Sequence, residues 1–138
     1  MYKSFKYEEL EVGQKASIDK LITDEVVMAF AAVTEDHNPI HVDDEFAKNS
    51  IFKERIAHGM LLAGLFSAVL GTHLPGVNTI YLKQTMEFLA PVRLGDIITA
   101  EVEVAEKMEK QKVRLFTTAR NQKGEMVAKG EALIKKPF

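Results

Sequence analysis

The chain has 138 residues, a net charge of -2 and no cysteine, and 46% of its residues are hydrophobic and 28% charged. This length suggests a single domain over 1–138, which can bury roughly two-thirds of the surface of the unfolded chain. The near-neutral charge argues against nucleic acid or an anionic membrane as a partner. The absence of cysteine excludes disulfides, thiolate nucleophiles and cysteine metal sites.

Targeting and membrane signals are weak. The first 15 residues lack the apolar region of a signal peptide, so we expect a cytoplasmic protein. The longest apolar stretch runs from Met60 to Leu70 and is broken only by Gly64 and Ser67. A membrane-spanning helix needs about 20 apolar residues, so we interpret this stretch as a buried helix and expect no membrane partner.

The first half of the chain predicts helices and loops. A cap at Thr23 or Asp24 begins a helix that should end near Glu35, because Asn38-Pro39 is a turn signal. A short helix is expected around 43–48, and the apolar helix from Gly59 to about residue 71. Apolar residues recur at helical spacing on one face of the first helix: Val26, Phe30 and Val33.

The second half predicts antiparallel strands. Apolar and polar residues alternate over 80–88 and 99–104, and 113–119 with 126–134 form a predicted hairpin. A first strand over 16–21 completes an α+β fold, in which one long buried helix lies against an antiparallel sheet of about five strands. One sheet face cannot cover a helix that is apolar all round, so loops, other helices or a second subunit must cover the rest. A homodimer is the simplest solution.

The segment from Thr34 to His41 concentrates polar side chains around a proline-fixed turn. Asp36 and His41 lie five positions apart across that turn, so their side chains can converge on one point. A water held between a carboxylate and an imidazole can lose one proton and the product can regain one, which is what hydration of an activated alkene requires. The alternative is structural: Asp36 and Asn38 cap turns, and His41 is an ordinary surface or core histidine.

The start of the apolar helix is a second candidate feature. The N–H of Gly59 belongs to the unpaired donors of a helix N-terminus, where developing negative charge is stabilised. A thioester carbonyl can be polarised there. Alternatively, Gly59 only eases the chain into the helix. No nucleophile elbow surrounds Ser67, which argues against a serine hydrolase, and the histidine spacing predicts no metal site.

These features together resemble the MaoC-like, (R)-specific enoyl-CoA hydratase family. The segment Phe30 to His41, with Asp-x-Asn-Pro-x-His at its end, and the segment His58 to Ser67 carry most of the likeness. Shorter matches extend it over the whole chain: Glu11 to Gln14, Phe46-Ala47, Ile80 to Leu82, Pro91-Val92, Leu94 to Asp96 and Glu101 to Val104. The family often has Gly or Ser where this chain has Glu35.

The resemblance implies a hot-dog fold, in which the sheet wraps the helix, and a homodimer whose sheets join edge to edge with the active sites near the interface. It implies Asp36 and His41 as catalytic residues and the Gly59 N–H as the oxyanion donor. It further implies that Asn38 supports the loop. The substrate-binding residues are expected to be Ser67, Leu70 and His58.

The expected reaction is addition of water to a trans-2-enoyl thioester, giving the (R)-3-hydroxyacyl product, in reversible lyase chemistry that the family links to polyhydroxyalkanoate synthesis. No metal or redox cofactor is expected, because coenzyme A is part of the substrate, and an acyl carrier protein is the other possible carrier. Two alternatives stay open: a hot-dog acyl-CoA thioesterase and a non-catalytic acyl-CoA-binding module. The sequence does not reveal the preferred acyl chain length.

Overall fold

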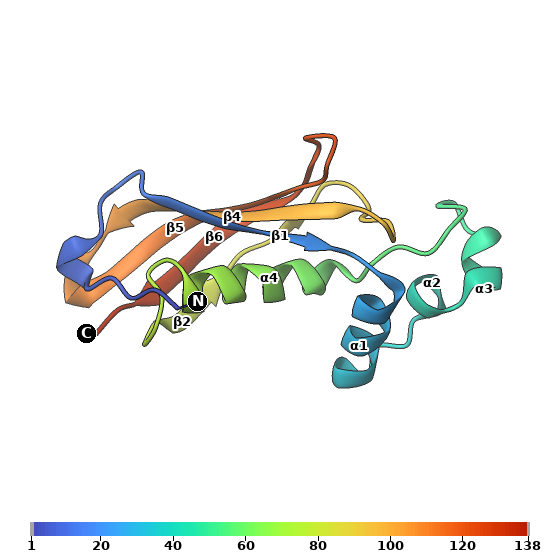
Figure 1. Ribbon diagram of the computed structural model, residues 1–138, viewed down its shortest axis with the longest axis horizontal. Coiled ribbons are helices and arrows are strands. Elements are labelled where there is room, and N and C mark those ends of the chain that lie inside the picture. Colours follow the sequence, from blue (N-terminus) through green and yellow to red (C-terminus); the bar gives the residue numbers. More distant parts are fainter. Residues whose placement is uncertain (1, 138) are drawn as a thin grey trace.

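A computed structural model describes residues 2–137 of the chain. Over these residues a six-stranded antiparallel sheet lies along one side of a long helix, α4 (Figure 1). The strand order is β1-β4-β5-β6-β2, and β3 pairs with β6. The strands are β1 (Lys15–Leu21), β2 (Ile80–Gln84), β3 (Glu87–Phe88), β4 (Ile97–Lys107), β5 (Lys112–Arg120) and β6 (Met126–Lys135). The predicted sheet of about five strands is thus extended by the two-residue β3.

The helices follow the predicted order, with one addition. The chain forms α1 (Asp24–Thr34), α2 (Pro39–Val42), α3 (Asp44–Lys48) and α4 (Gly59–Thr72), and 3-10 turns at Tyr7–Glu9 and Glu109–Gln111. The predicted turn at Asn38-Pro39 begins α2, because proline fits the first position of a helix. None of the described helices is both long and apolar enough to cross a membrane.

Helix α4 and the sheet form the core. Every second side chain of β4 from Ile98 to Val104 is fully buried, which is the pattern of a strand with one face against the core. Buried residues of α4 lie against this face: Leu61, Leu62, Leu65, Phe66, Val69 and Leu70. Helices α1 to α3 instead project beyond the N-terminal end of α4 (Figure 1). The loop that joins α1 to α2 lies beside this end, because the His58 ring is 2.9 Å from the Asp36 carbonyl.

Two predicted apolar faces differ from the structure. In α1 the buried residues are Val27 and Ala31, and Val33 is 82% exposed, so the predicted face is wrong at Val33. In β2 the alternation suggested that Ile80 and Leu82 face the core, but each is 46% exposed. The inward side chain of this edge strand is instead Tyr81, which is half-buried and packs against the core, so Ile80 and Leu82 lie on the opposite, open face.

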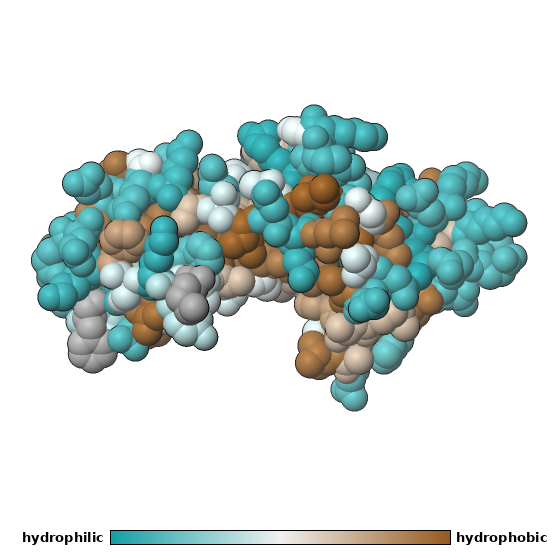
Figure 2. All heavy atoms as spheres, in the orientation of Figure 1, coloured by the Kyte–Doolittle hydropathy of each residue, from teal (hydrophilic) through white to brown (hydrophobic). Residues whose placement is uncertain are grey.

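One face of α4 also lacks cover. Met60 is 58% exposed, and Gly64, Ser67 and Ala68 are exposed further along the helix. Hydrophobic surface is visible in the middle of the molecule and near α1 (Figure 2). The sheet therefore covers only part of this apolar helix, as its all-round apolar character led us to expect.

Candidate active site

The loop between α1 and α2 is shaped by short-range hydrogen bonds. Glu35 ends α1 in the left-handed region, with φ 66°. The N–H of Asp36 donates to Thr34 Oγ1 at 3.2 Å, and Asp36 Oδ1 accepts from the N–H of Asn38 at 3.2 Å. Asn38 is the N-cap of α2, and its Oδ1 accepts from the N–H of Ile40 at 3.3 Å. The exposed Asp36 carboxylate is thus held in a defined turn and stays open to water.

His41 lies in α2 and is only 9% exposed. Its Nδ1 lies 2.7 Å from the carbonyl oxygen of Ile56. A carbonyl can only accept, so Nδ1 carries the proton and the neutral ring keeps a lone pair on Nε2. Burial lowers the pKa of His41 below 6.5, and nearby His58 acts in the same direction, whereas the bond to Ile56 and the Asp36 carboxylate oppose the shift. Burial and His58 both favour a neutral His41 ring whose Nε2 can accept a hydrogen bond.

His58 is the N-cap residue of α4 and lies behind His41. Its Nε2 donates to the backbone carbonyl of Asp36 at 2.9 Å. Its ring stacks on His41 with centroids 4.0 Å apart, and the ring of Phe30 lies 4.8 Å away on centroids. With 2% exposure, His58 supports both the Asp36 loop and the His41 ring from within, rather than lining the open cavity.

Asp36, His41 and His58 converge from three different segments. Each of the three offers a nitrogen or carboxylate oxygen, and these atoms all lie within 4.8 Å of one another. The sequence spacing did not predict this grouping of three. Such a grouping can hold a metal ion or a water. With its Nδ1–H bonded to the Ile56 carbonyl, His41 leaves Nε2 free to accept a hydrogen bond, so a water can be held between this ring and the Asp36 carboxylate.

A cavity of about 490 Å³ opens beside His41. Its walls are mainly apolar, and they include Phe52, Met60, Phe88, Leu89 and Val92. This size and character suit a small ligand that is largely apolar, with few polar groups to orient it. The imidazole of His41 therefore faces a space that an acyl chain can enter.

Gly59 lines the same cavity as the first residue of α4. Its N–H belongs to the donors that a helix leaves without an intrahelical partner. A Cβ at this position would lie 2.7 Å from Cε1 of Phe88, so glycine is needed for the close approach of the Phe88 ring. The N–H donor of Gly59, at the positive end of α4, and the neutral imidazole of His41 therefore line the same cavity.

Ser67 and Leu70, predicted to line the acyl pocket, do not line this cavity. Leu70 is 1% exposed and packs in the core. Ser67 is exposed and lies on the face of α4 that also carries Met60 and Ala63. A second cavity of about 480 Å³ between α4 and β2 shares Met60 with the first and reaches Ala63. An acyl chain that follows this face of α4 would approach Ser67. The predicted contact of Ser67 with the substrate therefore requires that the acyl chain enter the second cavity.

Several residues of the site escaped the sequence analysis. The Ile56 carbonyl fixes the tautomer of His41, and a backbone acceptor leaves no mark in a sequence. In the cavity wall from Phe88 to Val92, Phe88 was interpreted as the end of a strand and Pro91-Val92 only as a match to the family, and none of these residues was predicted to line a site. The run of apolar residues around Pro91, beyond the end of β3, was the available signal.

Comparison with known proteins places this geometry in a family. A family model described as "MaoC like domain" matches residues 7–126. The chain belongs to the MaoC-like family. Among curated MaoC-like relatives, an "(R)-specific enoyl-CoA hydratase" of Rhodospirillum rubrum is 44% identical over 131 residues, which are 95% of this chain and 91% of the relative. A protein of the same name from Aeromonas caviae is 48% identical over 129 residues, covering 93% and 96%.

Solved structures of MaoC-like proteins agree with the fold. The unliganded R-hydratase PhaJ1 of Pseudomonas aeruginosa has a TM-score of 0.94 at 50% identity and covers 97% of this chain and 86% of its own. The (R)-hydratase of Aeromonas caviae, described as involved in PHA biosynthesis, has a TM-score of 0.92 at 48% identity and covers 94% and 99%. The predicted α+β hot-dog fold is confirmed.

Proposed function

We propose that this chain is an (R)-specific enoyl-CoA hydratase, a lyase that reversibly adds water to trans-2-enoyl-CoA and gives (R)-3-hydroxyacyl-CoA. The observation that carries the proposal is the neutral His41 ring, which lies beside the Asp36 carboxylate and faces an apolar cavity that begins at Gly59. The relatives that are 44% and 48% identical carry this activity in their names. The cytoplasmic location stays a prediction.

Substrate binding begins at the first turn of α4. The thioester carbonyl accepts a hydrogen bond from the N–H of Gly59, and the helix dipole stabilises the enolate-like charge that develops on that oxygen. One such donor typically contributes about 10²–10³-fold to the rate. The acyl chain occupies the apolar cavity, where Phe88 packs against the start of the helix. This placement directs the double bond toward His41.

The acid–base pair then adds the water. His41 Nε2, which carries the lone pair, accepts one hydrogen bond from the water, and the Asp36 carboxylate takes the water's other proton. The oxygen bonds to the β-carbon while electrons move toward the carbonyl, and Asp36 returns the proton to the α-carbon. All atoms of the water thus end in the product: the oxygen and one proton form the 3-hydroxyl group, and the other proton is on the α-carbon. No metal or redox cofactor enters the proposed mechanism.

The proposal is tested with crotonyl-CoA and a thiol-reactive dye. Hydration removes the absorbance of the conjugated enoyl group, releases no thiol and gives the (R)-3-hydroxy product on chiral analysis. A thioesterase would release free coenzyme A, which reacts with the dye, and a binding module would bind without turnover. Either of those results refutes the assignment. The same assay with longer enoyl chains measures the chain-length preference.

The lowered pKa of His41 predicts the acid limb of the pH profile. The neutral ring is the competent form, so activity is lost as the pH falls through the pKa of His41. Because burial lowers that pKa below 6.5, the midpoint of the acid limb of kcat/KM for crotonyl-CoA should lie below pH 6.5. A midpoint at or above pH 6.5 in a profile of kcat/KM against pH would contradict this assignment.

We also propose that the enzyme is a homodimer. The supporting observations are the open face of α4 around Met60 and the edge strand β2, on which Ile80 and Leu82 are each 46% exposed. A second copy can pair its own β2 with this edge and cover both exposed apolar surfaces. Symmetric pairing of this kind is the commonest form of oligomer and removes an unpaired sheet edge.

Charge at the proposed interface should separate the subunits. Leu82→Glu places a carboxylate in the apolar contact and is expected to shift the protein from twice the 15.5 kDa chain mass toward the chain mass itself. Light scattering after size exclusion measures the change. Phe116→Glu is the matched control, since Phe116 is 44% exposed on β5, inside the sheet and away from its edge. A Leu82→Glu protein that stays dimeric would place the interface elsewhere.

A further inference from the structure

Arg55 is buried in a segment that looks like a charged surface loop. It follows Lys53 and Glu54, yet it is only 8% exposed. Its side chain contacts residues of all three helices that project beyond α4, namely α1, α2 and α3. A buried arginine is tolerated only when its charge and its donors are matched, so its partners indicate what it holds in place.

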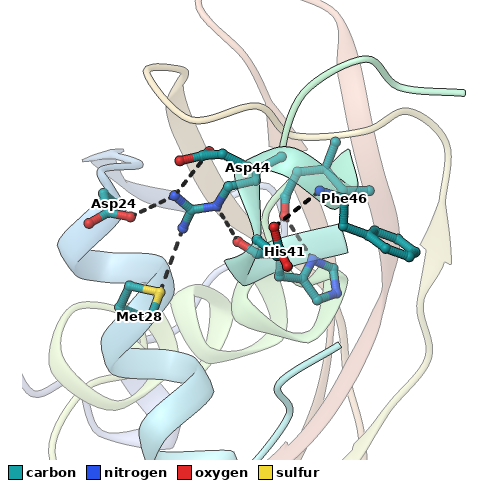
Figure 3. A network of polar contacts seen from close by, with 8 residues as sticks. Asp24, Met28, His41, Asp44 and Phe46 are labelled. Carbon is teal, nitrogen blue, oxygen red and sulfur yellow. Dashed lines mark hydrogen bonds and ion pairs between the residues drawn. The ribbon is translucent and has the colours of Figure 1, made fainter. Parts of the chain in front are cut away.

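The guanidinium joins the starts of two helices. Arg55 Nη1 lies 2.7 Å from Asp24 Oδ1 and 3.5 Å from Asp44 Oδ1. Asp24 begins α1 and Asp44 begins α3. Arg55 Nη2 also donates to the sulfur of Met28, in α1, at 3.6 Å (Figure 3). The planar fork of arginine donors allows these contacts to be made at once.

The remaining contact of Arg55 reaches the catalytic candidate. Arg55 Nε donates to the backbone carbonyl of His41 at 2.6 Å, and the neighbouring carbonyl of Ile56 accepts from the His41 ring at 2.7 Å. The N–H of Ile56 also donates to Ile40 at 3.3 Å. Two consecutive residues therefore hold His41 by both its backbone and its ring.

This support is needed because α2 has only four residues. The last four carbonyls of any helix lack intrahelical partners, so a helix of this length cannot fix its own position. Arg55 supplies one of the missing donors and ties α2 to α1 and α3 through the two carboxylates. The position of the His41 ring thus depends on a side chain that touches neither water nor substrate in the proposed mechanism.

We propose that Arg55 is a positioning residue for the hydration reaction, which holds the His41 ring at hydrogen-bond reach of the Asp36-bound water. This inference rests on the proposed function. A ring displaced by about 1 Å can lower the rate by about 10²-fold, because catalysis requires close alignment. Within residues 2–137, Gly59 and the cavity wall from Phe88 to Val92 have no hydrogen bond to Arg55 or to its partners, so substrate binding should change little.

The test compares Arg55→Gln and Arg55→Lys with wild type on crotonyl-CoA. Both variants should lower kcat by at least about 10-fold with KM changed by less than about 3-fold. Lysine keeps the charge but has no planar fork, so it cannot serve His41 and both carboxylates together. Arg114→Gln is the matched control, because this arginine also contacts two carboxylates, Glu106 and Glu131, but on the distant sheet surface.

A second readout does not depend on activity. In wild type, burial lowers the pKa of His41, so NMR titration of its ring carbon should show the pKa move up toward 6.5 in both Arg55 variants as the ring loses its fixed burial. Unchanged kcat and unchanged His41 titration in Arg55→Gln would overturn the inference. Full activity in Arg55→Lys would also overturn it, because charge alone would then suffice.

The two proposals fail separately. A wild-type protein without hydratase activity refutes the proposed function, and the His41 titration still tests the role of Arg55. If Arg55→Gln does not fold by circular dichroism, Arg55→Lys and the milder Asp24→Asn carry the test. Asp24→Asn removes the 2.7 Å ion pair and should lower kcat by about 2–5-fold with the same pattern in KM.

Discussion

Asp36→Asn is expected to lower kcat for crotonyl-CoA hydration by at least about 10²-fold. The amide keeps the shape of the carboxylate and can still accept from the N–H of Asn38, so the loop should keep its form. It cannot take a proton from the water, however, and the base of the mechanism is lost. Steady-state kinetics on the purified variant, with circular dichroism as the check of the fold, measure the effect.

Glu35→Gln is the matched control for this variant. Glu35 is the exposed neighbour of Asp36 and ends α1, so the change removes a nearby negative charge and leaves the catalytic carboxylate in place. Its kcat should stay within about 3-fold of wild type, since exposed charges are screened by water. A folded Asp36→Asn enzyme with near-normal turnover would remove Asp36 from the mechanism.

His41→Ala should be similarly severe, with a loss of kcat of at least about 10²-fold. The substitution removes the Nε2 lone pair that orients the water, and it also breaks the bond to the Ile56 carbonyl. The half-buried carbonyl loses its partner, so the free energy of unfolding should fall by about 1 kcal/mol. Kinetics and urea unfolding of the same preparation separate the two effects.

The control for the histidine is His37→Ala. His37 lies four residues earlier on the exposed loop, and its loss should change kcat by less than about 2-fold. If urea unfolding shows that His41→Ala is folded under the assay conditions, and its kcat nevertheless equals that of His37→Ala, the imidazole of His41 has no part in the chemistry.

Local patterns predicted most of the fold. The end of α1 followed from the turn signal at Asn38-Pro39, and the hairpin of β5 and β6 followed from the apolar pattern over 113–119 and 126–134. Which side chains of α1 and β2 face the core was harder to predict, because the exposure of a side chain depends on the neighbouring elements in the fold. Ile80 and Leu82 alternate like core residues, but in β2 they lie at an open sheet edge.

The site was predictable only where it is local. The spacing of Asp36 and His41 across one proline turn predicted that they converge, and they do lie together. The stacking of His58 on His41 and the bond from Arg55 to the His41 carbonyl join residues that are 17 and 14 positions apart. Such contacts depend on the tertiary fold, and a single sequence carries no pattern for them.

Glu35 departs from the family pattern at a position where the backbone favours glycine. The resemblance led us to expect Gly or Ser before Asp36. The structure places this residue in the left-handed region, with φ 66°, where glycine fits without steric penalty. A glutamate there costs about 1 kcal/mol or more of backbone strain. The hydrogen bonds of Asp36 and Asn38 keep the loop in this shape despite that strain.

Hydration in H₂¹⁸O tests the central claim most directly. If Asp36 and His41 deliver water to the β-carbon, wild-type enzyme incubated with crotonyl-CoA will give 3-hydroxybutyryl-CoA with one ¹⁸O in its 3-hydroxyl group and an intact thioester. Mass spectrometry of the product locates the label. Label in a free carboxylate, together with released coenzyme A, would show attack on the carbonyl instead and would contradict the account.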